Sequence, residues 1–502
     1  MIVQYTFIVF YKQITTVLRF MHKRYVGVMA SLLAALMVWV INPFAVPAEA
    51  NTVLAVAALM IVLWVSEAMP MPVVALLPLV LFPLLQIAPI DATASSYANP
   101  VIFLFMGGFM LGLAIEKWNL HRRIALNIVR ITGTSGNKII LGFIIATGLI
   151  SMWLSNTATA MMMFPIALSV IKVIGDNHSN QKGFTNFSLS VMLAIALGSN
   201  LGGIATLIGT PPNVAYAAFM QKRYAYTLSF VDWLLVCAPL SFLLMLSLYW
   251  VMVKWLYPNR MKEDAATKAM IQNEIATLGV MSKAEKRVLF VFVLTATLWI
   301  TKDLINKLNW VRLDDNMVAI IGATLLFLLP ASNEKKEALL LWSDTKNMAW
   351  GILLLFGGGI ALAGALEKAG LMQQLGQWFG QFGFNTLLLI FLVALVSLFV
   401  SEVMSNVAQV IVFAPVVSSL AEAAGLHPLL LGIPMTLAAS CASMLPMGTP
   451  PNAIAFSSGY IKLHQMTRVG FVMNLIAVVL ITLFCWLLLP LVFGSPQPIP
   501  GS

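Results

Sequence analysis

The sequence has little charge for its length. Of its 502 residues, 10% are Asp, Glu, Lys or Arg, whereas 60% are hydrophobic, which is not typical of a soluble domain of this length. Apolar runs recur along the whole chain, and no stretch is typical of a separate soluble domain. We therefore predict an all-α polytopic membrane protein, an integral membrane protein surrounded by membrane lipid.

The chain is also poor in cysteine and in clustered catalytic side chains. Its three cysteines lie in separate apolar segments without metal-ligand spacing: Cys237, Cys441 and Cys485. No Ser/His/Asp, His/Glu metal or paired-aspartate combination falls at membrane depth, so we do not expect an enzyme. The net charge of +10 comes from Lys and Arg in loops, which is typical of cytoplasmic flanks. We therefore expect no nucleic-acid partner.

The chain is predicted to consist of two transmembrane halves. Residues 1–24 have no small-residue cleavage site, which leaves open an interfacial leader or a misassigned start before Met21. The first half is 25–257, the polar segment 258–287 is a cytoplasmic linker, and the second half is 288–502. Together they are expected to form about eleven transmembrane helices plus two re-entrant hairpins.

Two apolar runs are too long for one ordinary span. The run Ile139–Ile171 contains Ser155–Thr157 and is flanked by Lys138 and Lys172. A single crossing would place one of these lysines outside the cytoplasm, which violates the positive-inside rule. A hairpin that turns at Ser155–Thr157 keeps both lysines on the cytoplasmic side. We therefore predict a re-entrant hairpin over 139–171.

The second run has the same character. It covers Phe384–Ala421 and carries Ser405-Asn406-Val407. Polar side chains at mid-membrane depth are costly unless they face protein, water or a ligand. A second hairpin is predicted over 384–421.

Three motifs occur twice in the same order. Leu104–Lys117 aligns without a gap on Leu355–Lys368, with shared Leu-Phe, Gly-Gly and Glu-Lys pairs. The Ser-Asn pairs follow, and Gly-Thr-Pro-Pro-Asn then recurs at Gly209–Asn213 and Gly448–Asn452. A Gly-Gly pair alone would indicate close helix packing, but the ordered triplet indicates an internal duplication.

The two copies are predicted to lie on opposite sides of the membrane. A basic cluster follows Lys117, whereas Ala369–Phe384 contains no Lys or Arg. This pattern is typical of an inverted-topology repeat, in which broken helices from both halves meet near the midplane and form a site for alternating access.

The broken helices can bind ions of both signs. If a helix stops at Ser155 and restarts after Thr157, its carbonyl end suits a hard cation such as Na⁺, and the N-terminal end attracts an anion. Thr210 and Thr449 precede proline and are expected N-caps of two further helices. The tips and turns carry no Lys, Arg or His, so amides, hydroxyls and co-bound cations would hold the anion.

Two alternatives stay open at this point. The polar groups of the broken helices could cap one another in a dry interface and bind no ligand. Glu402, three residues before Ser405, could bind a cation or a proton, or it could be hydrogen-bonded to backbone in a structural role.

The paired motifs resemble those of the divalent anion/sodium symporter family, which contains INDY-type dicarboxylate and citrate transporters. Ser155–Thr157 with Gly209–Asn213, repeated as Ser405–Val407 with Gly448–Asn452, carries the resemblance. It covers nearly the whole chain after about Tyr25. It implies a homodimer in which a transport domain moves against a fixed scaffold and carries Na⁺ and a C4-dicarboxylate by an elevator motion.

The resemblance also implies site residues by motif position. One Na⁺ site would consist of Ser151, Ser155, Asn156 and Gly209, and a second of Ser401, Met404, Asn406 and Gly448. Substrate would meet Asn156, Thr157, Thr210, Asn406, Thr449 and Pro450. Val407 stands where the first motif has threonine, so one hydroxyl is missing and the preference for a succinate-like or citrate-like substrate stays open.

The expected function is Na⁺-coupled import of dicarboxylates of the succinate, malate and fumarate type. We expect the bacterial inner membrane, with a cytoplasmic N-terminus and an extracytoplasmic C-terminus. A Na⁺-independent exchanger of dicarboxylate or citrate with the same fold is the first alternative. A passive anion channel is the second, although a channel would not need hairpins from both sides.

Overall fold

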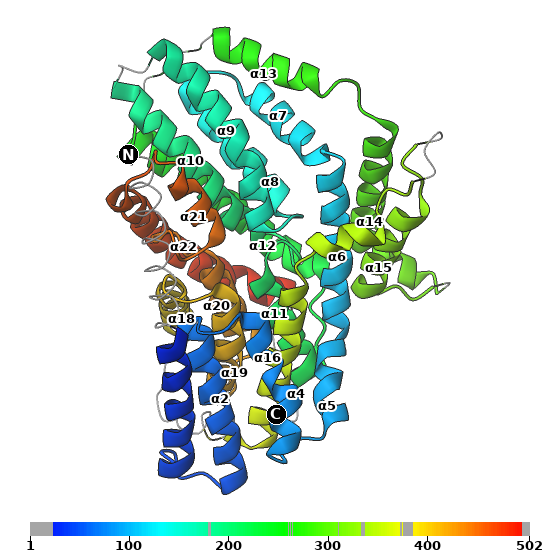
Figure 1. The fold of residues 1–502 in the computed structure, drawn as a ribbon, viewed down its shortest axis with the longest axis vertical. Coiled ribbons are helices and arrows are strands. Elements are labelled where there is room, and N and C mark those ends of the chain that lie inside the picture. Colours follow the sequence, from blue (N-terminus) through cyan, green and yellow to red (C-terminus); the bar gives the residue numbers. More distant parts are fainter. Residues whose placement is uncertain are drawn as a thin grey trace, which may run out of the picture. The chain divides into compact units, whose positions relative to one another are not determined.

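The architecture is helical throughout the described part of the chain. A computed structural model describes residues 24–178, 182–259, 261, 263, 265–309, 311–332, 337–371, 374 and 385–493 (Figure 1). Within these ranges ten helices are long and apolar enough to cross a membrane. Residues 1–23 of the predicted leader and Phe384, where the second hairpin was predicted to begin, lie outside the described residues.

The chain divides into two compact units. One is Met1–Ala98 with Trp350–Trp378, and the other is Asn99–Ala349 with Phe379–Ser502. Each unit draws on both sequence halves. The predicted halves 25–257 and 288–502 therefore do not coincide with the compact units. The division into these halves describes the duplication of the sequence and stays a prediction.

Unit 1 packs several short helices around α16. Its elements are the helix Arg24–Ile41, α2 (Ala48–Ser66), α3 (Met71–Val74), α4 (Leu77–Leu84), α5 (Ile90–Ala94), η1 (Ser95–Ala98) and α16 (Trp350–Lys368). Any side chain at Gly357 would collide with Tyr97, and any at Gly358 with the Ala75 backbone. The Gly-Gly pair of α16 thus permits close packing, as expected for glycine at helix crossings.

Unit 2 begins with α6 and contains the first hairpin. Its elements up to the middle of the chain are α6 (Pro100–Lys117), α7 (Leu120–Thr132), α8 (Gly136–Ser151), α9 (Asn156–His178), α10 (Lys182–Gly203), α11 (Pro211–Tyr224), α12 (Phe230–Trp250) and a π-helical continuation, η2 (Val251–Leu256). Asn99 caps α6 by accepting a hydrogen bond from the Val101 N–H (3.0 Å).

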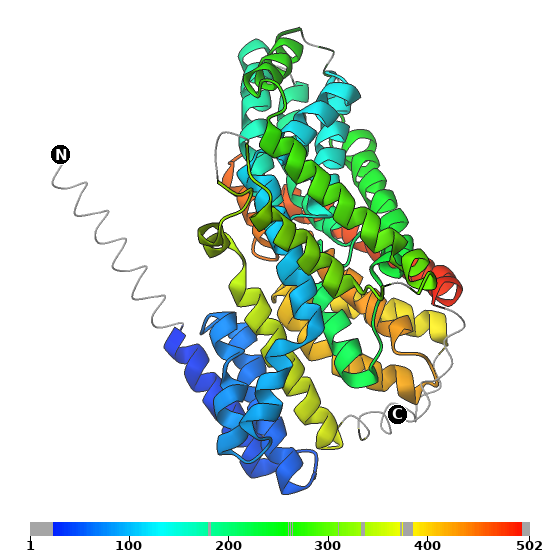
Figure 2. The same cartoon turned by 90° about the vertical axis from the view of Figure 1, so that its right-hand side faces the viewer.

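The rest of unit 2 repeats the hairpin and the broken helix. It contains α13 (Ala265–Thr277), α14 (Lys283–Lys307), α15 (Asp315–Leu328), η3 (Trp342–Asn347), α18 (Thr386–Ser401), α19 (Asn406–Ala423), α20 (Leu429–Ser440), α21 (Pro450–Ser457) and α22 (Leu463–Val492). Figure 2 shows these elements from a second side. The order of α8 to α11 therefore recurs as α18 to α21.

Two features differ from the prediction. The polar segment 258–287 contains α13, and α14 begins at Lys283 because Ser282 and Glu285 form a capping box. The first hairpin helix restarts at Asn156 rather than after Thr157, so these two side chains belong to the first turn of α9.

Candidate functional site

The two hairpin tips have the same internal hydrogen bond. In the first, the Ser151 hydroxyl at the end of α8 donates to Asn156 Oδ1 at the start of α9 (2.8 Å). In the second, the Ser401 hydroxyl shares its single hydrogen between Asn406 Oδ1 (2.7 Å) and the Ala439 carbonyl (2.7 Å). Each contact holds an asparagine amide oxygen beside the serine at the end of the preceding helix. Two pairs of predicted Na⁺ ligands therefore lie within hydrogen-bond distance of each other.

The Gly-Thr-Pro-Pro-Asn turns also have matching geometry. Thr210 and Thr449 are N-caps of α11 and α21, as predicted, and both adopt extended backbone angles. The closing Asn213 donates to the Thr206 carbonyl (2.9 Å), and Asn452 donates to the Leu445 carbonyl (3.1 Å). The two turns are thus tied back to carbonyls at the same spacing along the chain.

In the first copy, the turn packs directly on the hairpin tip. The Thr206 hydroxyl donates to the Met152 carbonyl. A Cβ on Gly203 would lie 2.2 Å from Asn156 Oδ1, and one on Gly209 would lie 3.0 Å from the Met152 carbonyl. The structure therefore brings Gly209 beside the tip that carries Ser151 and Asn156, and glycine is required for this approach.

In the second copy, Glu402 joins the tip to the segment that precedes the turn. This residue is 4% exposed, and its carboxylate accepts four hydrogen bonds. Three come from the N–H groups of 443–445, at 2.8, 2.9 and 3.1 Å, and one comes from the Asn474 amide at 2.6 Å. These bonds satisfy the buried carboxylate, as a buried charge requires. The structural alternative for Glu402 is thus the one that the geometry supports.

One residue joins the two copies of the site. Asn200 lies within α10, because this helix continues to Gly203. Its amide contacts Asn156 of the first copy and Thr449 and Asn452 of the second. Sequence reasoning did not identify Asn200 as a site residue, because nothing local in the sequence signals these distant contacts.

Polar groups at both tips stay available to a ligand. Ser155, Asn156 and Thr157 are half-buried, as are Ser405, Asn406 and Val407. Within the described residues the Thr157 hydroxyl and the Asn406 amide nitrogen make no hydrogen bond to protein. Thr210 and Thr449 are buried, at 3% and 6% exposed, whereas Pro450 is exposed.

The donor set fits a hard monovalent cation and a small anion. Hydroxyl, amide and carbonyl oxygens surround the tips, and these are the ligands that hard cations prefer. The starts of α9, α11, α19 and α21 present backbone N–H groups and the positive ends of helix dipoles. Met404 and Gly448 belong to the second tip and turn, where a Cβ on Gly448 would lie 3.4 Å from Glu402 Oε2.

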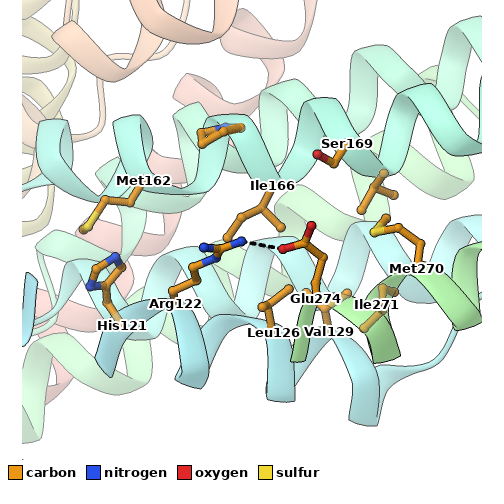
Figure 3. A pocket seen from close by; sticks show the side chains of 12 residues that line it. His121, Arg122, Leu126, Val129, Met162, Ile166, Ser169, Met270, Ile271 and Glu274 are labelled. Atoms are coloured by element: carbon orange, nitrogen blue, oxygen red, sulfur yellow. Dashed lines mark hydrogen bonds and ion pairs between the residues drawn. The ribbon is translucent and has the colours of Figure 1, made fainter. Parts of the chain in front are cut away.

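A separate cavity of about 250 Å³ lies between α7, α9 and α13, and Figure 3 shows it with the Arg122–Glu274 ion pair. His121 also lines it, and burial lowers the pKa of this imidazole. None of the predicted site residues is among its lining residues. The cavity is therefore distinct from the paired hairpin tips.

Paired hairpins and paired broken helices, in a chain whose described residues include ten helices long and apolar enough to span a membrane, define an integral membrane transport protein built on an internal repeat. The chain belongs to the sodium:sulfate symporter family, whose sequence model for the "sodium:sulfate symporter transmembrane region" matches residues 22–493. This match confirms the family resemblance of the motifs.

Relatives and solved structures agree with this assignment. A sodium-dependent dicarboxylate transporter, SdcS, of Staphylococcus saprophyticus is 39% identical, with 87% of this chain and 86% of the relative covered. SdcS of Staphylococcus aureus is 38% identical, with 94% and 93% covered. The fold resembles the YdaH transporter of Alcanivorax borkumensis, with a TM-score of 0.58 at 15% identity and 81% and 88% covered. It also resembles MtrF of Neisseria gonorrhoeae, with a TM-score of 0.52 at 15% identity and 82% and 86% covered.

Proposed function

We propose that this protein couples Na⁺ entry to the import of C4-dicarboxylates such as succinate, malate and fumarate. The observation that carries the proposal is the pair of equivalent tips, in which the Ser151 and Ser401 hydroxyls lie within hydrogen-bond distance of the amide oxygens of Asn156 and Asn406. The names of the relatives from Staphylococcus support Na⁺ as the coupling ion and dicarboxylate as the substrate.

Each site residue has a proposed role. The first Na⁺ is held by Ser151, Ser155, Asn156 and Gly209, and the second by Ser401, Met404, Asn406 and Gly448. The substrate carboxylates meet Asn156, Thr157, Thr210, Asn406, Thr449 and Pro450, with Val407 beside them. Since neutral groups hold the dianion, its charge is balanced by the co-bound Na⁺ ions, and release breaks no buried ion pair.

The proposal includes an assembly and a location. The protein works as a homodimer in a bacterial inner membrane, with its N-terminus in the cytoplasm and its C-terminus outside. The hairpins and broken helices move together in an elevator-type alternating-access cycle. The duplicated hairpins support this, because alternating access needs a site that closes from both sides.

Uptake of labelled succinate into proteoliposomes tests the proposal. Empty vesicles should accumulate succinate when Na⁺ is supplied outside, and K⁺ in its place should give no accumulation. Uptake that appears only after the vesicles are loaded with unlabelled dicarboxylate would identify an exchanger instead. Flux that neither saturates nor shows counterflow would identify a passive channel.

Two variants test the site itself. Asn156→Ala and Asn406→Ala each remove a cation ligand and a substrate donor, so each should abolish Na⁺-driven uptake while the protein is still produced and folded. Ser199→Ala is the matched control, because among the described residues this buried hydroxyl bonds only to the Ala196 carbonyl of its own helix (2.8 Å). Wild-type uptake by either asparagine variant would contradict the assignment.

A further inference from the structure

Asn200 is fully buried in the middle of unit 2, at 0% exposed. Its amide has hydrogen-bonding partners on two sides. Its Oδ1 accepts from Asn156 Nδ2 (3.5 Å), and its Nδ2 donates to Thr449 Oγ1 (3.1 Å) and Asn452 Oδ1 (3.2 Å). A single side chain thus connects the first hairpin tip with the second Gly-Thr-Pro-Pro-Asn turn.

The direction of these hydrogen bonds follows from the donors and acceptors. Asn156 Oδ1 is occupied by the Ser151 hydroxyl, so the Asn156 NH₂ group is the part that faces Asn200. Asn200 must then present its oxygen to Asn156 and its NH₂ group to Thr449. Any cation that binds Asn156 Oδ1 holds this same orientation, because a cation cannot be bound by the NH₂ end.

The hydroxyl hydrogen of Thr449 has no acceptor among the residues that the structure describes. Its oxygen accepts from Asn200 Nδ2 and, at 3.4 Å, from the Asn452 N–H. A hydroxyl has two acceptor lone pairs and one hydrogen, so both acceptor positions are filled. Its hydrogen is therefore left to donate, and the partner that it suits is an anion such as a substrate carboxylate.

The equivalent connection would join the second hairpin tip to the first Gly-Thr-Pro-Pro-Asn turn, and the described residues do not include one. Aligning Gly209 with Gly448 places Ala439 opposite Asn200. Asn213 is the counterpart of Asn452, and its Oδ1 is buried without a hydrogen-bond partner in the described part of the chain. The connection therefore runs in one direction only, from the first hairpin tip to the second turn.

We infer that Asn200 is a positioning residue that couples the cation at Asn156 to the substrate contact at Thr449. When Na⁺ fixes the Asn156 amide, Asn200 holds the Thr449 oxygen as an acceptor and so directs the Thr449 hydrogen toward the substrate carboxylate. This inference rests on the proposed function and assigns one part of the coupling between ion and substrate to a residue that touches neither.

A double-mutant cycle of Asn200→Ala and Thr449→Val tests the coupling. Asn200→Ala should raise the KM for succinate about tenfold or more, the effect of losing one hydrogen bond to a charged group. It should also make succinate binding depend less steeply on Na⁺ concentration. The double variant should have the KM of Thr449→Val alone, because both changes remove the same contact. Independent effects that multiply would overturn the inference.

Ser199→Ala is the control from the same buried helix, and its KM should match the wild type. If Asn200→Ala does not fold, Asn200→Asp serves as the second variant because it keeps the volume and the acceptor for Asn156. An aspartate at this position accepts the Thr449 hydrogen instead of donating to the Thr449 oxygen. The KM for succinate should therefore rise, while the Na⁺ concentration for half-maximal uptake should not rise. A wild-type KM in Asn200→Asp would overturn the inference.

Failure of the proposed function and failure of the coupling role of Asn200 give different results. If the wild-type protein shows no Na⁺-dependent succinate uptake, the proposed function is wrong. If the wild type transports succinate and the Asn200 variants keep its KM and its Na⁺ dependence, only the coupling role of Asn200 is wrong.

Discussion

At Gly203 the last residue of α10 lies against the side chain of Asn156. A Cβ at this position would stand 2.2 Å from Asn156 Oδ1, a distance at which the amide has to move. We predict that Gly203→Ala displaces this oxygen and raises the Na⁺ concentration for half-maximal uptake at least tenfold, as loss of one cation ligand would. Na⁺ titration of succinate uptake measures the effect.

Gly364→Ala is the matched control for that change. Gly364 is also a helical glycine, in α16, but a Cβ there meets no atom within 4 Å. Its Na⁺ dependence should equal that of the wild type. Equal half-saturation in Gly203→Ala and Gly364→Ala would show that the Asn156 oxygen does not bind the coupling ion.

Val407 is the position at which the two hairpin motifs differ. It occupies the second position of α19, as Thr157 does in α9, and both side chains are half-buried. The Thr157 hydroxyl has no protein hydrogen bond among the described residues, so it is free for a ligand. We predict that Val407→Thr changes the preference between succinate and citrate severalfold and leaves the Na⁺ dependence unaltered. Competition of each unlabelled acid against labelled succinate checks this, and an unchanged preference would remove Val407 from the substrate contacts.

Among the elements, the end of α6 is attached to η3 by an ion pair. Lys117 Nζ lies 2.8 Å from Asp344 Oδ2, which also accepts from the Leu341 N–H at 2.8 Å. Burial alone raises the pKa of Asp344, but the hydrogen bonds from Lys117 and Leu341 hold this pKa below its usual value. The pair is partly solvated, so its contribution to stability is about 1 kcal/mol or less.

The pH dependence of this contact follows from the sign of the shift. A carboxyl whose pKa is lowered by folding stabilises the protein above its unfolded-state pKa of about 3.9, and this contribution is lost as the pH falls through the folded-state value. Asp344→Asn should therefore lower the thermal unfolding midpoint at pH 7, and the difference from wild type should shrink below about pH 4. Asp303→Asn, at an exposed carboxylate, is the control. A difference that persists unchanged in acid would exclude the ion pair as its cause.

For the whole molecule, the features predicted from the sequence are those with a local cause. A helix break within the uncharged run Ile139–Ile171 was predictable because the polar residues Ser155–Thr157 interrupt it. The helix restarts at Thr210 and Thr449 were predictable because threonine followed by proline is a strong N-terminal signal.

Other features depend on contacts between distant segments. Glu402 accepts from the N–H groups of 443–445, about forty residues away in the chain, and Asn200 reaches Thr449 from the other sequence half. No periodicity or spacing signals such contacts, since only folding brings these segments together. The separation into two compact units likewise arises from packing, because each unit combines segments from both halves of the duplicated sequence.

Binding of Na⁺ should stabilise the folded protein as a whole, because the proposed ligands come from α8, α9, α18, α19 and the two turns, and they meet only in the folded state. A ligand present at a hundred times its Kd adds about 2.7 kcal/mol to the free energy of unfolding. We therefore predict that Na⁺ raises the thermal unfolding midpoint of the detergent-purified protein more than K⁺ does at equal ionic strength.

Succinate should raise this midpoint further in Na⁺ but not in K⁺, since the bound cations provide the positive charge for the dianion. The Asn156→Ala and Asn406→Ala variants should lose the difference between Na⁺ and K⁺. An equal effect of both salts on the wild type would indicate a general salt effect and would exclude a Na⁺ site at the hairpin tips.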